Sequence, residues 1–177
     1  MKADELRAMQ APLKSRYKED AGAARLTLRA RGDLSGEGIA CGVETGRALV
    51  EAGLHPYTGG SGLEVCSGDM LLQALVACAG VTLRAVATSL GIEVRSGKVE
   101  AEGDLDFRGT LGVAKDAPVG FEGIRLHFQV DSDAAPEQLE KLLQLTERYC
   151  VVLQTLRARP PVAVDIARQE PGTSAAV

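Results

Sequence analysis

The side chains of this 177-residue chain with the greatest potential for chemistry are its four cysteines: Cys41, Cys66, Cys78 and Cys150. The N-terminal sequence lacks the apolar core of a secretory signal, so we expect a cytoplasmic protein whose thiols stay reduced. A structural disulfide framework is therefore not expected. The chain has no Cys-x-x-Cys pair and its two histidines lie far apart, so the sequence predicts no zinc site.

Cys78 lies midway along SGDMLLQALVACAGVTLRAVATSL (Ser67–Leu90), the longest helix that the pattern predicts. The position admits two interpretations: a small apolar core residue, or a reactive thiol whose thiolate a nearby cation stabilises. Asp69, in the first turn, faces the positive end of the helix dipole. Cys78 lies nine residues further on, roughly 13 Å along the axis, and the dipole acts only over the first turn. A reactive Cys78 would therefore need an arginine from another element.

Cys66 directly precedes Ser67, the expected N-cap of this helix, where the dipole favours a thiolate. It cannot pair with Cys78 along a straight helix, because 12 residues span roughly 18 Å and a disulfide needs less than about 7 Å. Cys41 falls in an expected strand and is most simply a core residue. Cys150 lies in a second helical stretch, ERYCVVLQTL, and spacing alone does not place it near Cys78.

The surrounding pattern predicts an α+β fold with a largely antiparallel sheet packed on helices. Helices are expected at 3–18, where Pro12 should end or bend the helix, and at 67–90 up to Gly91. A pair of helices is expected after Pro136: one that runs up to Arg148 and Tyr149, and the Cys150 segment, which Pro160–Pro161 stops. The expected strands are 25–34, 38–45, 47–53, 92–109, 121–133 and 162–166.

Composition excludes several classes of function. The net charge of −4 provides no dense basic patch, and aromatic residues make up only 3% of the chain, so a nucleic-acid partner is not expected. The central helix has only 14 residues, Met70–Leu83, before Arg84 interrupts the charge-free run. A bilayer span needs about 20, so no membrane partner is expected. The helix is apolar on nearly every side, which is typical of a helix enclosed by other elements.

The run GDMLLQALVACAGVTL resembles the central-helix signature of the OsmC/Ohr superfamily, and ERYCVVLQTL after PEQLEKLL resembles its second-cysteine segment. The resemblance implies an OsmC-like domain at 23–168, with a helical extension at 1–22 and a polar tail at 169–177. It also implies an intertwined homodimer whose long central helices are buried between sheets. Carried over by position, Cys78 would be the peroxidatic and Cys150 the resolving cysteine. No metal, cofactor or prosthetic group is implied.

The chain departs from the hydroperoxidase branch of that superfamily at three places. Gly68 stands where that branch has a glutamate that holds an arginine over the thiolate, and Asp69 follows one residue later. The first strand–strand turn, LSGEG, carries no arginine, and Val151 replaces a proline. Asp69 is therefore either a cap residue or a catalytic carboxylate. The arginines that could serve as the electrostatic partner of Cys78 are Arg29, Arg31, Arg47 and Arg148. The predicted site includes Arg47 and Arg148.

Two hypotheses follow. The first is a thiol-dependent peroxidase for organic hydroperoxides or hydrogen peroxide, acting in stress protection and reduced by a thiol or lipoyl-type donor. The second is a non-enzymatic dimer of the same fold that binds a small apolar or thiol-containing ligand in its interface cavity. The pair of thiols favours the first hypothesis, and the missing glutamate and turn arginine favour the second.

Overall fold

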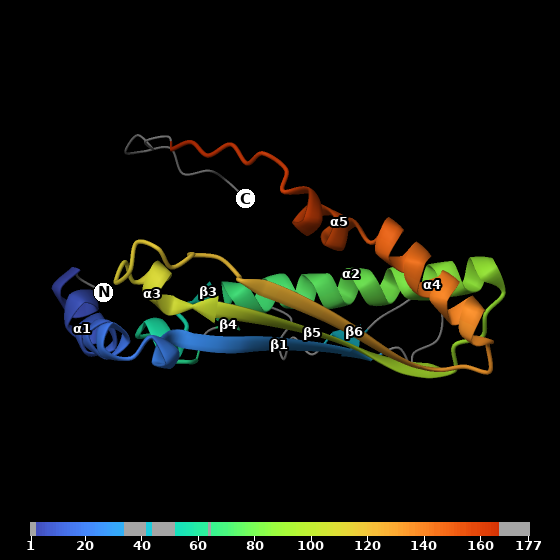
Figure 1. The fold of residues 1–177 in the computed structure, drawn as a ribbon, viewed down its shortest axis with the longest axis horizontal. Coiled ribbons are helices and arrows are strands. Elements are labelled where there is room, and N and C mark those ends of the chain that lie inside the picture. Colours follow the sequence, from blue (N-terminus) through green and yellow to red (C-terminus); the bar gives the residue numbers. More distant parts are fainter. Residues whose placement is uncertain (1–2, 34–41, 44–51, 64, 167–177) are drawn as a thin grey trace, which may run out of the picture.

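The computed structural model describes residues 3–33, 42–43, 52–63 and 65–166 (Figure 1). Its helices are α1 (Ala3–Glu19), α2 (Ser67–Leu90), α3 (Phe107–Thr110), α4 (Pro136–Tyr149) and α5 (Val151–Ala158), with short 3-10 turns at Ala21–Ala24 and Pro56–Thr58. Its strands are β1 (Arg25–Asp33), β2 (Gly42–Val43), β3 (Ala52–Gly53), β4 (Val65–Cys66), β5 (Ser96–Asp106) and β6 (Gly123–Asp131).

Three long antiparallel strands form the main sheet, in the order β1-β5-β6, with the two-residue β2 beside β1. Alternate residues of β5 are buried, among them Val99 and Ala101. In β6, Ile124 and Phe128 are half-buried while His127 between them is exposed. This period-two pattern turns one face of the sheet towards the core. The predicted α+β class with an antiparallel sheet is confirmed.

Helix α2 runs along the apolar face of the sheet, and α4 and α5 pack against the helix in turn (Figure 1). The buried residues of α2 form one broad face: Leu72, Leu75, Val76, Ala79, Gly80, Leu83, Val86 and Ala87. On its other side Leu71 and Val81 are exposed. The expectation that other elements enclose α2 on nearly every side is therefore not met by the described residues of one chain.

Helix α2 has 24 residues, longer than its charge-free run, and by length and composition alone it could cross a membrane. The length of α2 therefore does not exclude a membrane span, contrary to the expectation from its charge-free run. The packing of α2 on the sheet, α4 and α5 accounts for the apolar residues of its buried face.

The ends of α2 agree in part with the expectation. Gly91 adopts the left-handed conformation (φ 67°, ψ 23°) that ends the helix, and Asp69 lies in the first turn. The N-cap is Cys66, however, and its side chain makes no capping hydrogen bond. Ser67, expected as the N-cap, is instead the first helical residue.

The expected helices are confirmed in the described residues. Helix α1 runs from Ala3 through Pro12 to Glu19. The expected helix pair is α4 and α5, and Cys150 separates them with an extended backbone (φ −71°, ψ 105°). The strand expected at 162–166 is wrong, because these residues pair with no described strand. Instead Val164 is 89% and Ile166 99% exposed, and this segment extends beyond α5 (Figure 1). Of the expected strands at 38–45 and 47–53, only β2 and β3 fall within the described residues.

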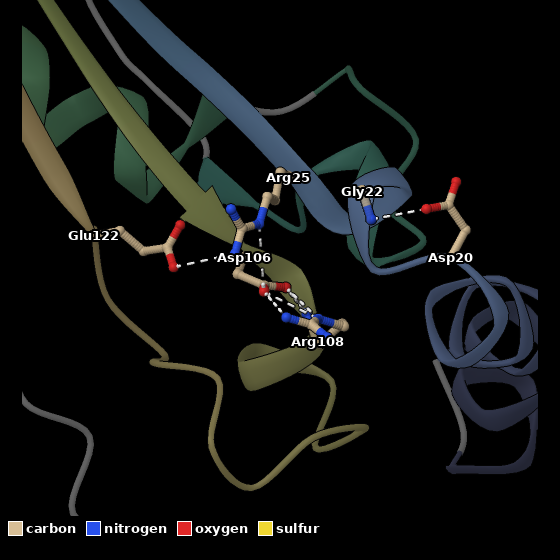
Figure 2. Close-up of polar contacts among 6 residues, drawn as sticks. All are labelled: Asp20, Gly22, Arg25, Asp106, Arg108 and Glu122. Atoms are coloured by element: carbon tan, nitrogen blue, oxygen red, sulfur yellow. Dashed lines mark hydrogen bonds and ion pairs between the residues drawn. The ribbon is translucent and has the colours of Figure 1, made fainter.

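A buried carboxylate fixes the far end of the sheet. Asp106, only 1% exposed, ends β5 and caps α3 by accepting a hydrogen bond from the backbone N–H of Arg108. The Arg108 guanidinium donates hydrogen bonds to the same carboxylate, and the Arg25 Nε of β1 lies 3.9 Å from its Oδ2 (Figure 2). Helix α1 is anchored nearby, where the Tyr17 hydroxyl donates to the Tyr57 carbonyl at 2.6 Å.

Candidate functional site

Cys78 and Cys150 come together although 72 residues separate them in sequence. Cys78 lies at the middle of α2 and is half-buried, and Cys150 lies at the junction of α4 and α5 and is 0% exposed. The Cys150 thiol donates a hydrogen bond to the Cys78 sulfur. The two sulfurs are therefore close enough for chemistry between them.

The interruption of the helix at Cys150, between α4 and α5, places the first N–H groups of α5 beside Cys78. Helix α4 packs on α2 through the buried side chains of Leu142 and Thr146, and its last turn delivers Cys150 to the core. Helix α5 then starts at Val151. The first N–H groups of a helix have no partner within the helix, and those of Val151 and Val152 point at the Cys78 sulfur.

Two opposing effects set the pKa of Cys78. Desolvation by burial raises it, but hydrogen bonds from the Val152 N–H, the Cys150 thiol, Thr82 and the Val151 N–H together lower it below the ordinary value. Hydrogen bonds to the charged form of an acid favour that form. The start of a second helix therefore supplies the stabilisation that the dipole of α2 cannot reach.

Cys150 is shifted in the opposite direction. Burial raises its pKa to about 11, and the adjacent Cys78 sulfur adds to the rise, while N–H groups of Leu153 and Val152 lower it. A thiol with this pKa keeps its proton at neutral pH. The pair therefore consists of one thiol prone to ionise and one that remains a donor.

Thr82, one turn after Cys78, also belongs to the site. Its hydroxyl donates to the Cys78 carbonyl oxygen at 2.7 Å and lies within hydrogen-bonding reach of the sulfur. Sequence reasoning missed Thr82 and the two valine amides. The signals available were a Thr four residues after the cysteine and the possibility of a helix start after Cys150.

Of the other candidate residues, Arg148 and Asp69 make their described contacts away from Cys78. Arg148 is exposed, with its guanidinium 5.5 Å from the centre of the Tyr149 ring. Arg47 lies outside the described residues, and Arg29 and Arg31 lie in β1. Within the described part of the chain, no arginine is among the hydrogen-bond donors that lower the pKa of Cys78. The role of an arginine stays a prediction.

Asp69 belongs to a different cluster at the start of α2. Burial raises its pKa, and nearby His55 opposes that shift. The His55 ring stacks on Phe107 at 5.0 Å, and its Nδ1 accepts a hydrogen bond from the Tyr57 N–H. This arrangement joins the loop before α2 to the end of β5. A catalytic role for Asp69 remains a prediction.

The remaining thiols lie elsewhere. Cys66 is the N-cap residue of α2, and Cys41 lies outside the described residues. Among the described side chains, no group of three His, Cys, Asp or Glu residues is gathered as metal ligands.

A cavity of about 620 Å³ lies between α2, β6 and the α4–α5 pair. Its walls are mainly apolar, including Leu75, one turn before Cys78, and Leu153, one turn after Cys150. Neither cysteine is part of its lining. Glu147 and Arg157, which form an ion pair at 2.9 Å, contribute charge to the lining.

Comparison with known proteins identifies the family. The family model for OsmC-like proteins matches residues 60–165, which include α2, both cysteines and the α4–α5 pair. The chain belongs to the OsmC-like protein family. Comparison with curated proteins finds no match.

Two solved structures resemble this OsmC-like chain. One is an OsmC-like hydroperoxide resistance protein from Jannaschia sp. CCS1, 17% identical, with a TM-score of 0.56 over 85% of this chain and 97% of that one. The other is an OsmC-like protein from Mycoplasma pneumoniae, 16% identical, with a TM-score of 0.52 over 72% of this chain and 85% of that one. At these identities the likeness shows a shared fold.

Proposed function

We propose that this OsmC-like protein is a thiol-dependent peroxidase with Cys78 as nucleophile and Cys150 as resolving thiol. The observation that carries the proposal is the hydrogen-bonded pair itself, in which Cys78 accepts from Cys150 and from the first N–H groups of α5. The name of the Jannaschia neighbour, a hydroperoxide resistance protein, supports the same class of chemistry.

The reaction follows from the different states of the two sulfurs. The Cys78 thiolate attacks one peroxide oxygen, the O–O bond breaks, and an alcohol or water leaves once its oxygen takes up a proton. Cys78 is then a sulfenic acid. Cys150 attacks this sulfur, releases the oxygen as water or hydroxide, and forms a disulfide. An external thiol or lipoyl-type dithiol restores both thiols, which suits a protein located in the reducing cytoplasm.

Organic hydroperoxides are the substrates that the surroundings favour. The apolar cavity beside the pair could hold the hydrocarbon part of such a molecule while its oxygens meet Cys78. Hydrogen peroxide has no apolar part and would gain nothing from the cavity. We therefore expect a higher kcat/KM for cumene hydroperoxide than for hydrogen peroxide.

Peroxide consumption with a dithiol reductant tests the proposal, using the parent, Cys78→Ser, Cys150→Ser and Cys66→Ser as a matched thiol control. We expect Cys78→Ser to lose turnover, Cys150→Ser to lose sustained turnover, and Cys66→Ser to resemble the parent. Equal rates in all four proteins would overturn it.

We also propose that the protein is a homodimer. Helix α2 leaves Leu71 and Val81 exposed, and Val162, Val164 and Ile166 form an exposed apolar row with strand spacing. β6 is an edge strand of the described sheet. A second copy would cover the open side of α2 and offer the 162–166 segment a place to pack.

The second candidate function is binding without catalysis. The observation that favours it is the apolar cavity, because neither cysteine lines it. A fluorescent apolar probe tests this candidate. Equal probe affinity in the parent and in a Cys78→Ser, Cys150→Ser double variant, together with no peroxide consumption by the parent, would favour binding over catalysis.

A further inference from the structure

The departing oxygen of the peroxide needs a proton, and the donor is a question that the two-cysteine scheme leaves open. An alkoxide or hydroxide is a poor leaving group, so a positioned acid that protonates it during O–O cleavage accelerates the step. Such an acid must lie beside the Cys78 sulfur. The inference drawn here rests on the proposed peroxidase function.

Four described residues place donors at that sulfur. The N–H groups of Val151 and Val152 stabilise charge, but they are backbone amides and do not give up protons at neutral pH. The Thr82 hydroxyl already donates to the Cys78 carbonyl at 2.7 Å, and as an alcohol it is no more acidic than the group it would protonate. The Cys150 thiol is the remaining donor, and it is hydrogen-bonded to the reacting sulfur.

We propose that Cys150 acts first as the general acid that protonates the leaving oxygen, and only then as the resolving nucleophile. The Cys78 thiolate forms an S–O bond with the distal oxygen of ROOH, and the O–O electron pair goes to RO. RO takes the proton of Cys150 and leaves as ROH, and the S–H electron pair remains on Cys150 as a thiolate. Cys78 is oxidised to the sulfenic acid and the peroxide is reduced to the alcohol.

The second step uses the thiolate that the first step created. Cys150 attacks the Cys78 sulfur, the S–S bond forms, the S–O bond breaks, and hydroxide leaves. In total, one thiolate, one thiol and ROOH give a disulfide, ROH and hydroxide. The resolving thiol is therefore activated only when a sulfenic acid is present beside it.

The burial of Cys150 supports both roles. It is 0% exposed, and its pKa of about 11 keeps the proton on sulfur until the reaction begins. That pKa still lies well below the pKa of water, the conjugate acid of a hydroxide leaving group. The transfer is therefore favourable once the O–O bond starts to break.

Single-turnover kinetics with protein in excess over peroxide test the proposal in a Cys41→Ser, Cys66→Ser background. Cys150→Ala is compared with the unsubstituted background protein, each at a pH above its Cys78 alkylation midpoint, so that the thiolate is fully formed in both. Two oxidants are used: tert-butyl hydroperoxide, which releases an alkoxide, and peracetic acid, which releases a carboxylate whose conjugate acid has a pKa of roughly 4. Residual peroxide and dimedone-labelled Cys78 are the readouts.

We expect Cys150→Ala to slow the reaction with tert-butyl hydroperoxide by about 10²-fold or more, and the reaction with peracetic acid far less. A thiol that only resolves would leave the first step unchanged with both oxidants, and that result would overturn the proposal. An equal loss with both oxidants would also overturn it, because it would indicate altered packing around Cys78. A loss confined to tert-butyl hydroperoxide in Thr82→Val instead would assign the acid to Thr82.

The outcome separates this proposal from the function on which it rests. A background protein that reacts with neither oxidant contradicts the peroxidase. A background protein that reacts with both, paired with a Cys150→Ala variant of unchanged rate, contradicts only the acid role. The peracetic acid reaction also shows that Cys150→Ala retains a folded, reactive Cys78.

Discussion

At the scale of single residues, Cys78 and Cys150 show how one pair of identical side chains acquires opposite properties. Burial removes both thiols partly from water, and this raises a thiol pKa. In Cys78 four hydrogen-bond donors outweigh that rise. Cys150 is fully buried beside the Cys78 sulfur, and the negative charge on that sulfur raises the pKa of Cys150 further. The difference lies in the neighbours of the two thiols, and it supports the proposed role of Cys78 as nucleophile.

The pH dependence of alkylation tests that assignment. Because the folded pKa of Cys78 is lowered, its alkylation by iodoacetamide should reach half its maximal rate below the value of about 8.5 for an ordinary thiol. Cys150 should stay unmodified until the pH approaches 11. Peptide mass spectrometry follows each thiol separately. Equal profiles for the two would contradict the assignment.

Asp106 provides a residue-scale prediction about stability. Hydrogen bonds from Arg108 lower its pKa, so its contribution is fully present above the unfolded pKa of about 3.8 and is lost as the pH falls through the lower folded value. We expect Asp106→Asn to reduce the free energy of unfolding by about 1–3 kcal/mol at pH 7. The difference in the free energy of unfolding between Asp106→Asn and the parent should become smaller below pH 4, as measured by urea unfolding.

Asp131 offers the matched control for that measurement. It is an exposed carboxylate paired with Arg95, and exposed pairs contribute little. Asp131→Asn should therefore change stability much less than Asp106→Asn. Equal effects would show that burial of the Asp106 pair is not what matters.

At the scale of elements, the start of α5 provides Cys78 with donors that the sequence did not predict, and the role of an arginine stays a prediction. The first two N–H groups of α5 donate hydrogen bonds to the Cys78 sulfur. They are free to do so because a new helix begins after Cys150. A search of the sequence for charged side chains does not detect backbone N–H donors. The sequence pointed to both thiols of the candidate site, but it did not point to the backbone donors that lower the pKa of Cys78.

The same contrast holds for the fold. β5, β6, α2 and α4 could be predicted because their apolar residues repeat with clear strand or helix periods and Gly91 marks an end. The pair of helices after β6 was also expected, but the extended backbone at Cys150 that separates them was not. A helix was expected at 3–18 with an end or a bend at Pro12, and α1 runs through Pro12 to Glu19. The 162–166 segment has the strand period but lacks a strand to pair with in this chain.

Replacing the first residue of α5 tests the element directly. Proline is favoured at the first helical position, and Cys150 already has the extended backbone that precedes proline. Val151→Pro should therefore preserve α5 while removing one N–H donor. We expect Cys78 alkylation at pH 7 to slow by roughly two- to tenfold, the value of one hydrogen bond.

Val151→Ala is the control for that substitution, because it shortens an exposed side chain and keeps the N–H. It should alkylate like the parent. If both variants alkylated at the parent rate, the N–H of Val151 would not contribute to Cys78 reactivity.

At the scale of the whole molecule, the described residues of a single chain leave two apolar features open to solvent. One is the outer side of α2, and the other is the row of alternate side chains at 162–166. Apolar surface of this kind marks interaction sites. The proposed dimer accounts for both features with one partner, a second copy of the chain.

Sedimentation velocity at micromolar concentration tests the dimer. The parent should sediment as a dimer, and Val164→Lys, on the apolar row, should shift it towards monomer. Ala163→Lys lies on the opposite side of the same extended segment and should remain dimeric. A monomeric parent would contradict the proposal, and equal behaviour of the two variants would remove the 162–166 segment from the interface.

The central claim is that Cys78 and Cys150 form one redox unit, and the most direct test is disulfide mapping after a single equivalent of cumene hydroperoxide. Free thiols are blocked after the reaction, and the peptides are identified by mass spectrometry without reduction. We predict one disulfide per chain, joining Cys78 to Cys150 in nearly stoichiometric yield, with Cys66 still a free thiol. Recovery of Cys78 and Cys150 as separate reduced peptides, or a disulfide from Cys78 to another cysteine, would contradict the account.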